Sequence, residues 1–314
     1  MRIVFMGTPE FAVPSLEALL KTEDRVVGIV TQPDRPRGRG QRLSPSPVKV
    51  IAQREEIPLL QPTKMKDPSF MAELSAWKPD VIAVAAFGRI LPPAILSLPS
   101  RGCINVHGSL LPKYRGAGPI QWALINGETE TGITTMLMDE GMDTGAILLQ
   151  ATMVIGPDDT AGSLASRLAD LGGRLLVETL TQSKAGTLTP RPQDHGQATL
   201  APLLKKEDGA LNWTMSATSI ANRIRGLTPW PGAYTFLKTD RWTISRSVAL
   251  DEATTLAPGQ IVAFTKDAIQ VATGKGVLAI RELQPANGRR MPAAQYLAGH
   301  PLQTGMQLTQ SQVR

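Results

Sequence analysis

The chain has 314 residues, of which 42% are apolar and 19% are charged, and this composition excludes wholesale disorder. At roughly 100–200 residues per domain, the length suggests about two domains. Apolar runs stay well below the ~18 residues of a membrane span, and the opening letters MRIVFMGTPEF predict a first strand rather than a signal peptide. A single cysteine, Cys103, excludes an internal disulfide framework and favours a reducing cytoplasm, and the three histidines disfavour a metal site.

The positive charge is confined to the last third of the chain. Residues 1–204 carry 20 basic and 20 acidic side chains, whereas residues 205–314 carry 13 basic and 7 acidic ones. The second group accounts for the whole net charge of +6. A basic module attached to a neutral one indicates a polyanionic partner, most often a nucleic acid.

The first half of the sequence alternates short apolar runs with segments of helical periodicity. The apolar runs predict strands over residues 2–6, 25–31, 81–86 and 103–106. The segments between them predict helices over residues 14–20, 47–54, 70–77 and 120–125. The run VIAVAA at 81–86 has no polar member, as expected for a strand buried on both faces of a parallel sheet. This alternation predicts a doubly wound α/β domain.

Two further strands and a long helix are expected next. Residues 133–138 and 146–155 are joined by a loop rich in Gly and Asp, so we expect the two strands to pair antiparallel. Asp159 and Thr160 can cap a helix over residues 163–180. Three prolines and the lack of periodicity then predict a linker over residues 189–202.

The remaining residues predict a second, smaller domain. A helix is expected over residues 216–225, with short strands over residues 242–248, 259–264, 268–272 and 277–283. Short strands separated by Gly, Pro and Asn turns are typical of a small β-barrel. The expected division is therefore an α/β domain over 1–188, a linker over 189–207 and a barrel domain over 208–314.

The turn after the first strand lacks a dinucleotide-binding pattern. Only Gly7 is present where G-x-G-x-x-G is needed, and Glu10 stands where a pyrophosphate would approach. A nicotinamide oxidoreductase is therefore disfavoured.

Residues 32–47 form an Arg-rich segment. Its basic members, set against the single acid Asp34, are Arg35, Arg37, Arg39 and Arg42. The glycines and prolines argue against regular structure. Because the segment follows a predicted parallel strand, it is expected at the ligand crevice of the sheet, where guanidinium groups could contact phosphates. The alternative is a solvated surface loop.

Two short segments supply polar groups suited to catalysis. Asn105 and His107 stand two apart at the end of a predicted strand, so both side chains project from one face. An Asn amide can donate to an oxyanion, and a His can exchange a proton near neutral pH, although a structural buried His is the alternative. Asp139, Glu140 and Asp143 crowd a Gly-rich turn. The lack of nearby Cys or His ligands favours orientation of His107 over metal binding.

These segments resemble a known family. The run NVHGSLLP at 105–112, followed by YRG at 114–116 and by Pro119, resembles the signature of the 10-formyltetrahydrofolate-dependent formyltransferases. The run DEGMDTG at 139–145 resembles the second motif of that family, with its acid at Asp143. The resemblance implies a Rossmann-like N-terminal domain and formyl transfer to an amine. Asn105 would donate to the oxyanion, His107 would assist, and Asp143 would orient His107.

The resemblance also implies a folate co-substrate, 10-formyltetrahydrofolate, and no metal. The residues that match the folate-binding segments of the family are Phe87, Arg89, Ile90 and Leu91 after the buried strand, and Ser109, Leu110, Leu111 and Pro112 in the signature. For the apolar members, simple packing in the core is the alternative.

Within the family, the start of the chain, the Arg-rich segment and the run LTPWPGA at 227–233 resemble the members that formylate methionyl-tRNA. This implies initiator Met-tRNA as partner, an RNA contact by Arg35, Arg37, Arg39 and Arg42, and an OB-like C-terminal domain. Candidate phosphate contacts in that domain are Lys205, Lys206, Arg223 and Arg225. The alternatives are a folate-dependent formyltransferase acting on a small amine and an RNA-binding module on an inactive α/β scaffold. We expect a monomer.

Overall fold

The computed structural model describes residues 1–37 and 42–312. The chain divides into two compact units. The α/β unit comprises Met1–Pro119, Glu130–Val154 and Ala165–Pro202, and the barrel unit comprises Ile120–Thr129, Ile155–Leu164 and Leu203–Arg314. The predicted boundaries 1–188, 189–207 and 208–314 stay predictions.

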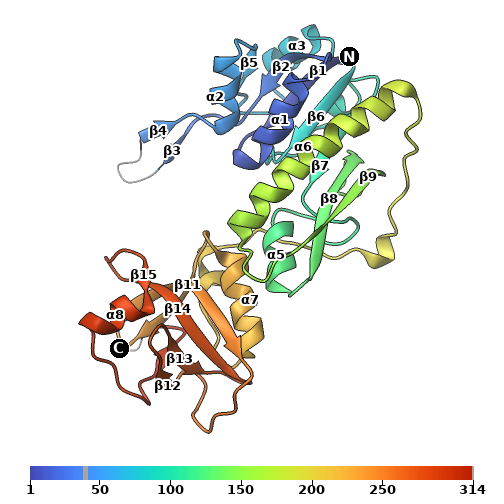
Figure 1. The fold of residues 1–314 in the computed structure, drawn as a ribbon. Helices are drawn as coiled ribbons and strands as arrows, with labels where there is room; N and C mark the ends of the chain where they lie inside the picture. The colour runs from blue at the N-terminus through green and yellow to red at the C-terminus, as the bar shows by residue number, and fades with distance from the viewer. Residues whose placement is uncertain (38–41, 313–314) are drawn as a thin grey trace. The chain divides into compact units, whose positions relative to one another are not determined.

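The α/β unit is built on a sheet with the strand order β5-β2-β1-β6-β7-β8-β9 (Figure 1). Its parallel part consists of β1 (Arg2–Gly7), β2 (Arg25–Val30), β5 (Leu59–Leu60), β6 (Val81–Ala85) and β7 (Cys103–His107). Every residue of β6 is buried, as its uninterrupted apolar run predicts. The strand order reverses between β1 and β6, which makes this sheet Rossmann-like and places a ligand crevice at the carboxyl ends of these strands.

Two antiparallel strands extend the sheet beyond β7. β8 (Glu130–Leu137) pairs antiparallel with both β7 and β9 (Ile147–Val154). The predicted antiparallel extension is therefore confirmed. Because β8 runs antiparallel to β7, Leu137 at the end of β8 lies opposite Ile104, near the start of β7, and the loop that carries Asp143 begins there.

Three helices of the α/β unit correspond to helices predicted from the sequence, whereas the short helix over Pro93–Leu96 was not predicted. The unit contains α1 (Val13–Leu20), α2 (Pro47–Arg54), α3 (Pro68–Ala76) and α4 (Pro93–Leu96). The Ser46 hydroxyl accepts from the backbone N–H of Lys49 at 3.1 Å, and Pro47 occupies the first turn, where its missing N–H has no cost.

The helix α6 (Ala161–Ala185) covers one face of the sheet. A Cβ at Gly172 would lie 2.9 Å from Val106 of β7, so this helix packs directly on that strand. Its start confirms the predicted cap, because the Thr160 hydroxyl accepts from the backbone N–H of Ser163 at 3.2 Å.

The Arg-rich segment departs from the expectation of irregular structure. β3 (Arg35–Arg37) pairs antiparallel with β4 (Arg42–Ser44), and Pro36 stands opposite Leu43. Proline has no backbone N–H to donate, and this is tolerated in an edge strand, where some N–H groups have no neighbouring strand to bind. Arg39, between the two strands, lies outside the described residues.

The barrel unit contains a curled antiparallel sheet with the strand order β12-β13-β14-β11-β10-β16, with β15 paired to β14. The strands are β10 (Ala233–Leu237), β11 (Asp240–Leu250), β12 (Ile261–Phe264), β13 (Ile269–Ala272), β14 (Val277–Pro285), β15 (Met291–Pro292) and β16 (Leu308–Thr309). The N–H of Ile261 donates to the Met306 carbonyl at 2.9 Å, and that of Leu308 to the Gly259 carbonyl at 2.8 Å. These bonds link the two ends of the sheet, and the predicted OB-like domain is confirmed.

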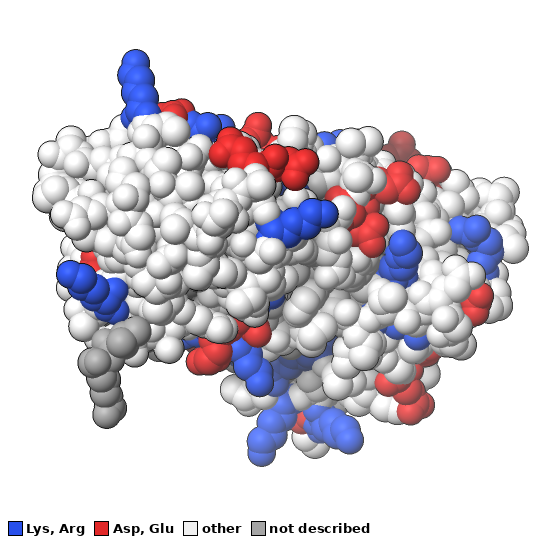
Figure 2. All heavy atoms as spheres, turned by 90° about the horizontal axis from the view of Figure 1, so that it is seen from below, with Lys and Arg blue, Asp and Glu red and all other residues white. Residues whose placement is uncertain are grey.

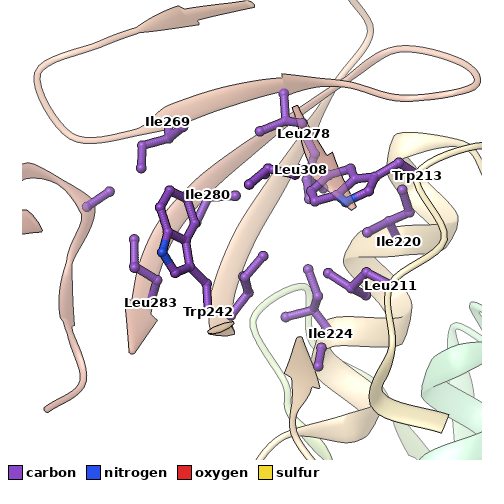
Figure 3. Close-up of a cluster of buried hydrophobic side chains, with 14 of the residues drawn as sticks. Leu211, Trp213, Ile220, Ile224, Trp242, Ile269, Leu278, Ile280, Leu283 and Leu308 are labelled. Carbon is purple, nitrogen blue, oxygen red and sulfur yellow. The ribbon is translucent and has the colours of Figure 1, made fainter. Parts of the chain in front are cut away.

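Helices complete the barrel unit. α5 (Pro119–Ile125) begins at its boundary with the α/β unit, α7 (Ala217–Leu227) begins at the cap Ser216, and α8 (Ala293–Gly299) follows β15. The sequence patterns predicted α7 but missed α8 and β10. Figure 3 shows side chains of α7 and of the sheet converging on one apolar core, which includes Trp242 and Ile224.

Cys103, at the start of β7, has a deeply buried thiol. Its residue is 1% exposed, and burial raises the pKa of the thiol to about 12. Since the thiolate is the reactive form, we expect an aromatic disulfide reagent to leave the folded protein unmodified at mildly alkaline pH and to modify one thiol per chain in guanidinium chloride. Absorbance of the released thiolate measures both. Rapid modification of the folded protein would contradict this burial.

Candidate active site

His107 is held at the carboxyl end of β7. The residue is 5% exposed, and its Nε2 donates to the backbone carbonyl of Tyr114 at 2.9 Å. A carbonyl oxygen can only accept, so the proton of the neutral ring is on Nε2 and the lone pair is on Nδ1. Nδ1 lies 3.7 Å from Oδ2 of Asp143. The nitrogen available for proton exchange therefore faces a carboxylate.

Asp143 is presented by the loop between β8 and β9. Its Oδ2 accepts from the backbone N–H of Gly116 at 2.8 Å, and its backbone has a φ of +54°, in the left-handed region. A Cβ at Gly145 would lie 1.8 Å from the Leu137 carbonyl, so glycine is required for the loop to return this close to β8. The loop therefore has a specific shape that directs the Asp143 carboxylate to His107 and Gly116.

The loop also contains the other two acids of the motif, Asp139 and Glu140. Oδ1 of Asp139 accepts from the backbone N–H of Gly141 at 3.0 Å and from the Thr144 hydroxyl at 2.7 Å. Asp139 therefore shapes the turn, while Glu140 is exposed. Among the described residues, no group of three or more His, Cys, Asp or Glu side chains lies close enough to hold a metal ion.

Asn105 stands on β7 two residues before His107. Its neighbours across the sheet are Val84 of β6 and Met136 of β8. Residues two apart on a strand project from the same face, so the Asn105 amide and the His107 ring share one side of the sheet. Within the described part of the chain, the structure gives the Asn105 amide no hydrogen-bond partner, which leaves its N–H groups available to a ligand.

The candidate folate residues after β6 divide by exposure. Phe87 and Leu91 are 2% and 3% exposed and pack in the core, whereas Ile90 is 83% exposed. The guanidinium of Arg89 donates to the Thr63 carbonyl at 2.8 Å. Ile90 thus offers an apolar surface to a ligand, while Phe87 and Leu91 support the segment from beneath.

The signature residues Ser109, Leu110, Leu111 and Pro112 show a similar division. Ser109 is fully buried, and its hydroxyl donates to the Lys113 carbonyl at 2.6 Å. Leu111 is 3% exposed, and Gln150 donates to its carbonyl at 2.9 Å. Leu110 and Pro112 are half-buried and keep surface for a ligand. Ser109 and Leu111 are buried and hold the loop in its conformation.

A cavity of about 320 Å³ opens at the carboxyl ends of β1, β2 and β6. Its lining includes Thr8, Gln32, Arg35 and Ser46. This is the place where the strand order reverses and where open α/β sheets bind ligands. Nearby, Asp34 is paired with Lys49 at 2.7 Å, and this hydrogen bond lowers the pKa of Asp34 below its usual range. Asp34 therefore stays ionised, and its negative charge is balanced by Lys49 rather than by Arg35.

The basic candidates of the barrel unit are not equivalent. Lys205 and Lys206 are exposed. Arg223 donates to the Asp208 carbonyl, and Arg225 donates to the Gly156 carbonyl at 3.1 Å, so both guanidinium groups stabilise their own unit. Burial lowers the pKa of Arg225. Figure 2 shows basic and acidic side chains interspersed on the face that it draws, rather than one continuous basic patch.

Sequence reasoning missed three contributors to this site. The Tyr114 carbonyl orients His107, and the Gly116 N–H binds Asp143. Both belong to the signature, so the motif itself was the available signal. The third is Gln193, whose side-chain amide donates to the Asp143 carbonyl at 2.8 Å. It lies in the proline-containing segment predicted as a linker, which gave no sign of this contact.

Known protein families match this chain in two consecutive parts. The pattern of the Formyl transferase family matches residues 1–180, and that of the Formyl transferase C-terminal domain matches residues 203–301. The Methionyl-tRNA formyltransferase of Citrifermentans bemidjiense is 50% identical over 305 residues, covering 97% of this chain and 95% of the relative. That of Trichlorobacter lovleyi is 52% identical over 312 residues, covering 99% and 98%.

Solved structures agree at the level of the fold. The N-formyltransferase from Helicobacter canadensis, solved with folinic acid and dTDP-3-aminofucose, superposes with a TM-score of 0.69 at 19% identity, covering 93% of this chain and all of the other. Within the described residues, no helix is long and apolar enough to cross a membrane.

Proposed function

This chain belongs to the formyl transferase family, and on that basis we propose that it transfers a formyl group from 10-formyltetrahydrofolate to the α-amine of methionine on initiator tRNA. The observation that carries the choice of acceptor is the similarity along both units to relatives named Methionyl-tRNA formyltransferase. A barrel domain of OB type suits this choice, because such domains bind single-stranded nucleic acid.

His107 and Asp143 are proposed to take the proton of the attacking amine. The folate supplies the formyl carbon, and the amine must be neutral to attack it. Nδ1 of His107 carries the free lone pair, and the Asp143 carboxylate at 3.7 Å stabilises the imidazolium that forms. This separation exceeds a normal hydrogen bond, and catalytic contacts of this kind shorten when substrate binds.

Asn105 is proposed to stabilise the charge that develops on the formyl oxygen. Its amide lies on the same face of β7 as His107, and an uncharged N–H donor in a partly buried site acts strongly on an oxyanion. The folate would contact Ile90, Leu110 and Pro112, with Phe87, Arg89, Leu91, Ser109 and Leu111 holding these segments in shape.

The tRNA is proposed to contact the Arg-rich segment and the exposed lysines. Arg35, at the cavity, Arg37, Arg39 and Arg42 would contact phosphates, together with Lys205 and Lys206. Each phosphate contact adds to the salt dependence of binding. We therefore expect the KM for Met-tRNA to rise steeply with salt while the KM for the folate changes little.

The direct test offers the full-length chain three acceptors with 10-formyltetrahydrofolate. We expect formyl transfer to Met-tRNA, with negligible transfer to glycinamide ribonucleotide and to uncharged tRNA, because only the first combines the amine with the polyanion. Acid-stable formylmethionine released from the tRNA, and tetrahydrofolate formed, measure the reaction. Transfer confined to the small amine would favour a small-molecule formyltransferase, and transfer to neither would contradict the proposal.

Cytoplasmic location and a monomeric state are parts of the same proposal. The one cysteine is buried and reduced, as in proteins of reducing compartments. Light scattering of the purified chain with and without Met-tRNA tests the monomer.

A further inference from the structure

The segment from residue 191 to residue 201 crosses the site described above. At one end, Arg191 and Ile147 exchange two backbone hydrogen bonds of 2.8 Å. At the other, the N–H of Arg115 donates to the Thr199 carbonyl at 2.8 Å, and the N–H of Ala201 donates to the Arg115 carbonyl at 2.7 Å. This crossing segment is therefore anchored to the start of β9 and to the loop after β7, on both sides of Asp143.

Gln193 is the buried side chain of the crossing segment. It is 7% exposed, and its Oε1 accepts from Nε and Nη2 of Arg115 at 3.1 and 2.7 Å. Its Nε2 donates to the carbonyls of Asp143 and Gly145 at 2.8 and 2.7 Å. If the amide were flipped, its NH2 group would face the N–H groups of Arg115 and its oxygen would face the two backbone carbonyls. The orientation described here is therefore the one that satisfies every group. The Gln193 amide thus binds the loop at the residues on both sides of Thr144.

Arg115 holds Gln193 from the opposite side. Its residue is 7% exposed, and Nη2 also lies 3.0 Å from Nδ1 of His195, which must accept. Among the described residues, no carboxylate pairs with this guanidinium, so neutral acceptors satisfy it. Burying a charged group in this way is unfavourable unless its hydrogen bonds are well made. The fork of Arg115 therefore fixes the amide of Gln193 with little freedom.

Two neighbouring residues, Arg115 and Gly116, therefore both hold Asp143 in place. The Gly116 N–H binds its carboxylate, and the Arg115 side chain, through Gln193, binds its carbonyl. The left-handed backbone of Asp143 needs such support, because a non-glycine residue adopts it only when neighbouring contacts stabilise it. We propose that Gln193 and Arg115 are positioning residues that set the distance between Asp143 and His107; this rests on the roles proposed above for that pair.

The test replaces Gln193 by Glu, which keeps the size and the contact with Arg115 but turns the donor to the two carbonyls into an acceptor. We expect kcat for formyl transfer to Met-tRNA to fall by about 10- to 100-fold, as for a small displacement of a catalytic group. The KM values for folate and Met-tRNA should stay within about twofold, since binding surfaces are untouched. Gln303→Glu, an exposed change with the same charge away from this site, is the matched control and should retain full activity.

A double-mutant cycle with Asp143→Asn separates positioning from general damage. If Gln193 acts through Asp143, then Gln193→Glu causes no further loss of kcat in the Asp143→Asn background. Loss by the full single-mutant factor in that background would overturn the inference. Normal kcat in Asp143→Asn alone would instead refute the proposed role of Asp143, so the two failures are distinguishable.

Arg115→Lys provides an independent variant should Gln193→Glu fold poorly. It keeps the charge, but one ammonium cannot reproduce the planar fork that donates to both Gln193 and His195. We expect a similar fall in kcat, again absent in the Asp143→Asn background. Unchanged kcat in Arg115→Lys, measured per folded molecule by circular dichroism, would count against the inference.

Discussion

Replacement of His107 by Ala is expected to lower kcat/KM for formyl transfer by about 10²- to 10⁴-fold, the range for loss of a general acid–base group. The ring places its free Nδ1 before the Asp143 carboxylate, 3.7 Å away, where an amine proton can be received and the resulting charge stabilised. Initial rates with Met-tRNA and 10-formyltetrahydrofolate measure the effect.

Two controls separate proton exchange from a structural role of His107. His107→Gln can still donate to the Tyr114 carbonyl but lacks a titratable nitrogen, so we expect it to be as inactive as His107→Ala. His300→Ala removes another His that lies 3.0 Å from a backbone carbonyl, that of Tyr296, and should stay fully active. Recovery of activity in His107→Gln would show that the hydrogen bond to Tyr114, rather than proton transfer, is what the reaction needs.

Replacement of Trp242 by Ala is expected to destabilise the barrel unit by about 3–5 kcal/mol, the usual cost of removing a large core aromatic. The side chain is fully buried in the core (Figure 3). Its ring packs edge-to-face with that of Tyr296, with centroids 5.1 Å apart. Its Nε1 donates to Asp240 at 3.1 Å, a bond that the truncation also removes. Urea unfolding followed by circular dichroism measures the change.

Trp230→Ala is the matched control for this prediction. Trp230 is 49% exposed, so its removal opens no cavity and should change the free energy of unfolding by less than about 0.5 kcal/mol. If the two substitutions cost the same, Trp242 would not be a centre of the core. If Trp242→Ala shifts one unfolding transition to lower urea concentration and leaves a second transition unchanged, the two units unfold separately.

The parallel strands and their helices could be predicted because their signals are local. The buried run of β6, the cap at Ser46 and the cap at Thr160 each depend on a few neighbouring residues and on hydrogen bonds within one turn. The short strand β5 and the helix α8 could not, because tertiary pairing and packing, rather than their own few residues, stabilise them.

The candidate site shows the same distinction. The motifs identified Asn105, His107 and Asp143 from sequence because each lies in a short run with its own pattern. The nitrogen of His107 that is free, and the groups that hold Asp143, could not be identified in this way, since both depend on Tyr114, Gly116 and Gln193.

Local patterns in the chain were therefore enough to predict the longer strands and helices, the two kinds of domain and the polar groups available for catalysis. The spatial relation among those groups came from contacts between distant segments, such as the 50-residue separation that Gln193 bridges to reach Asp143. An aperiodic, proline-containing segment carries no local sign of its partners, because its hydrogen bonds are made to Arg115 and to the β8–β9 loop, which lie far from it in the sequence.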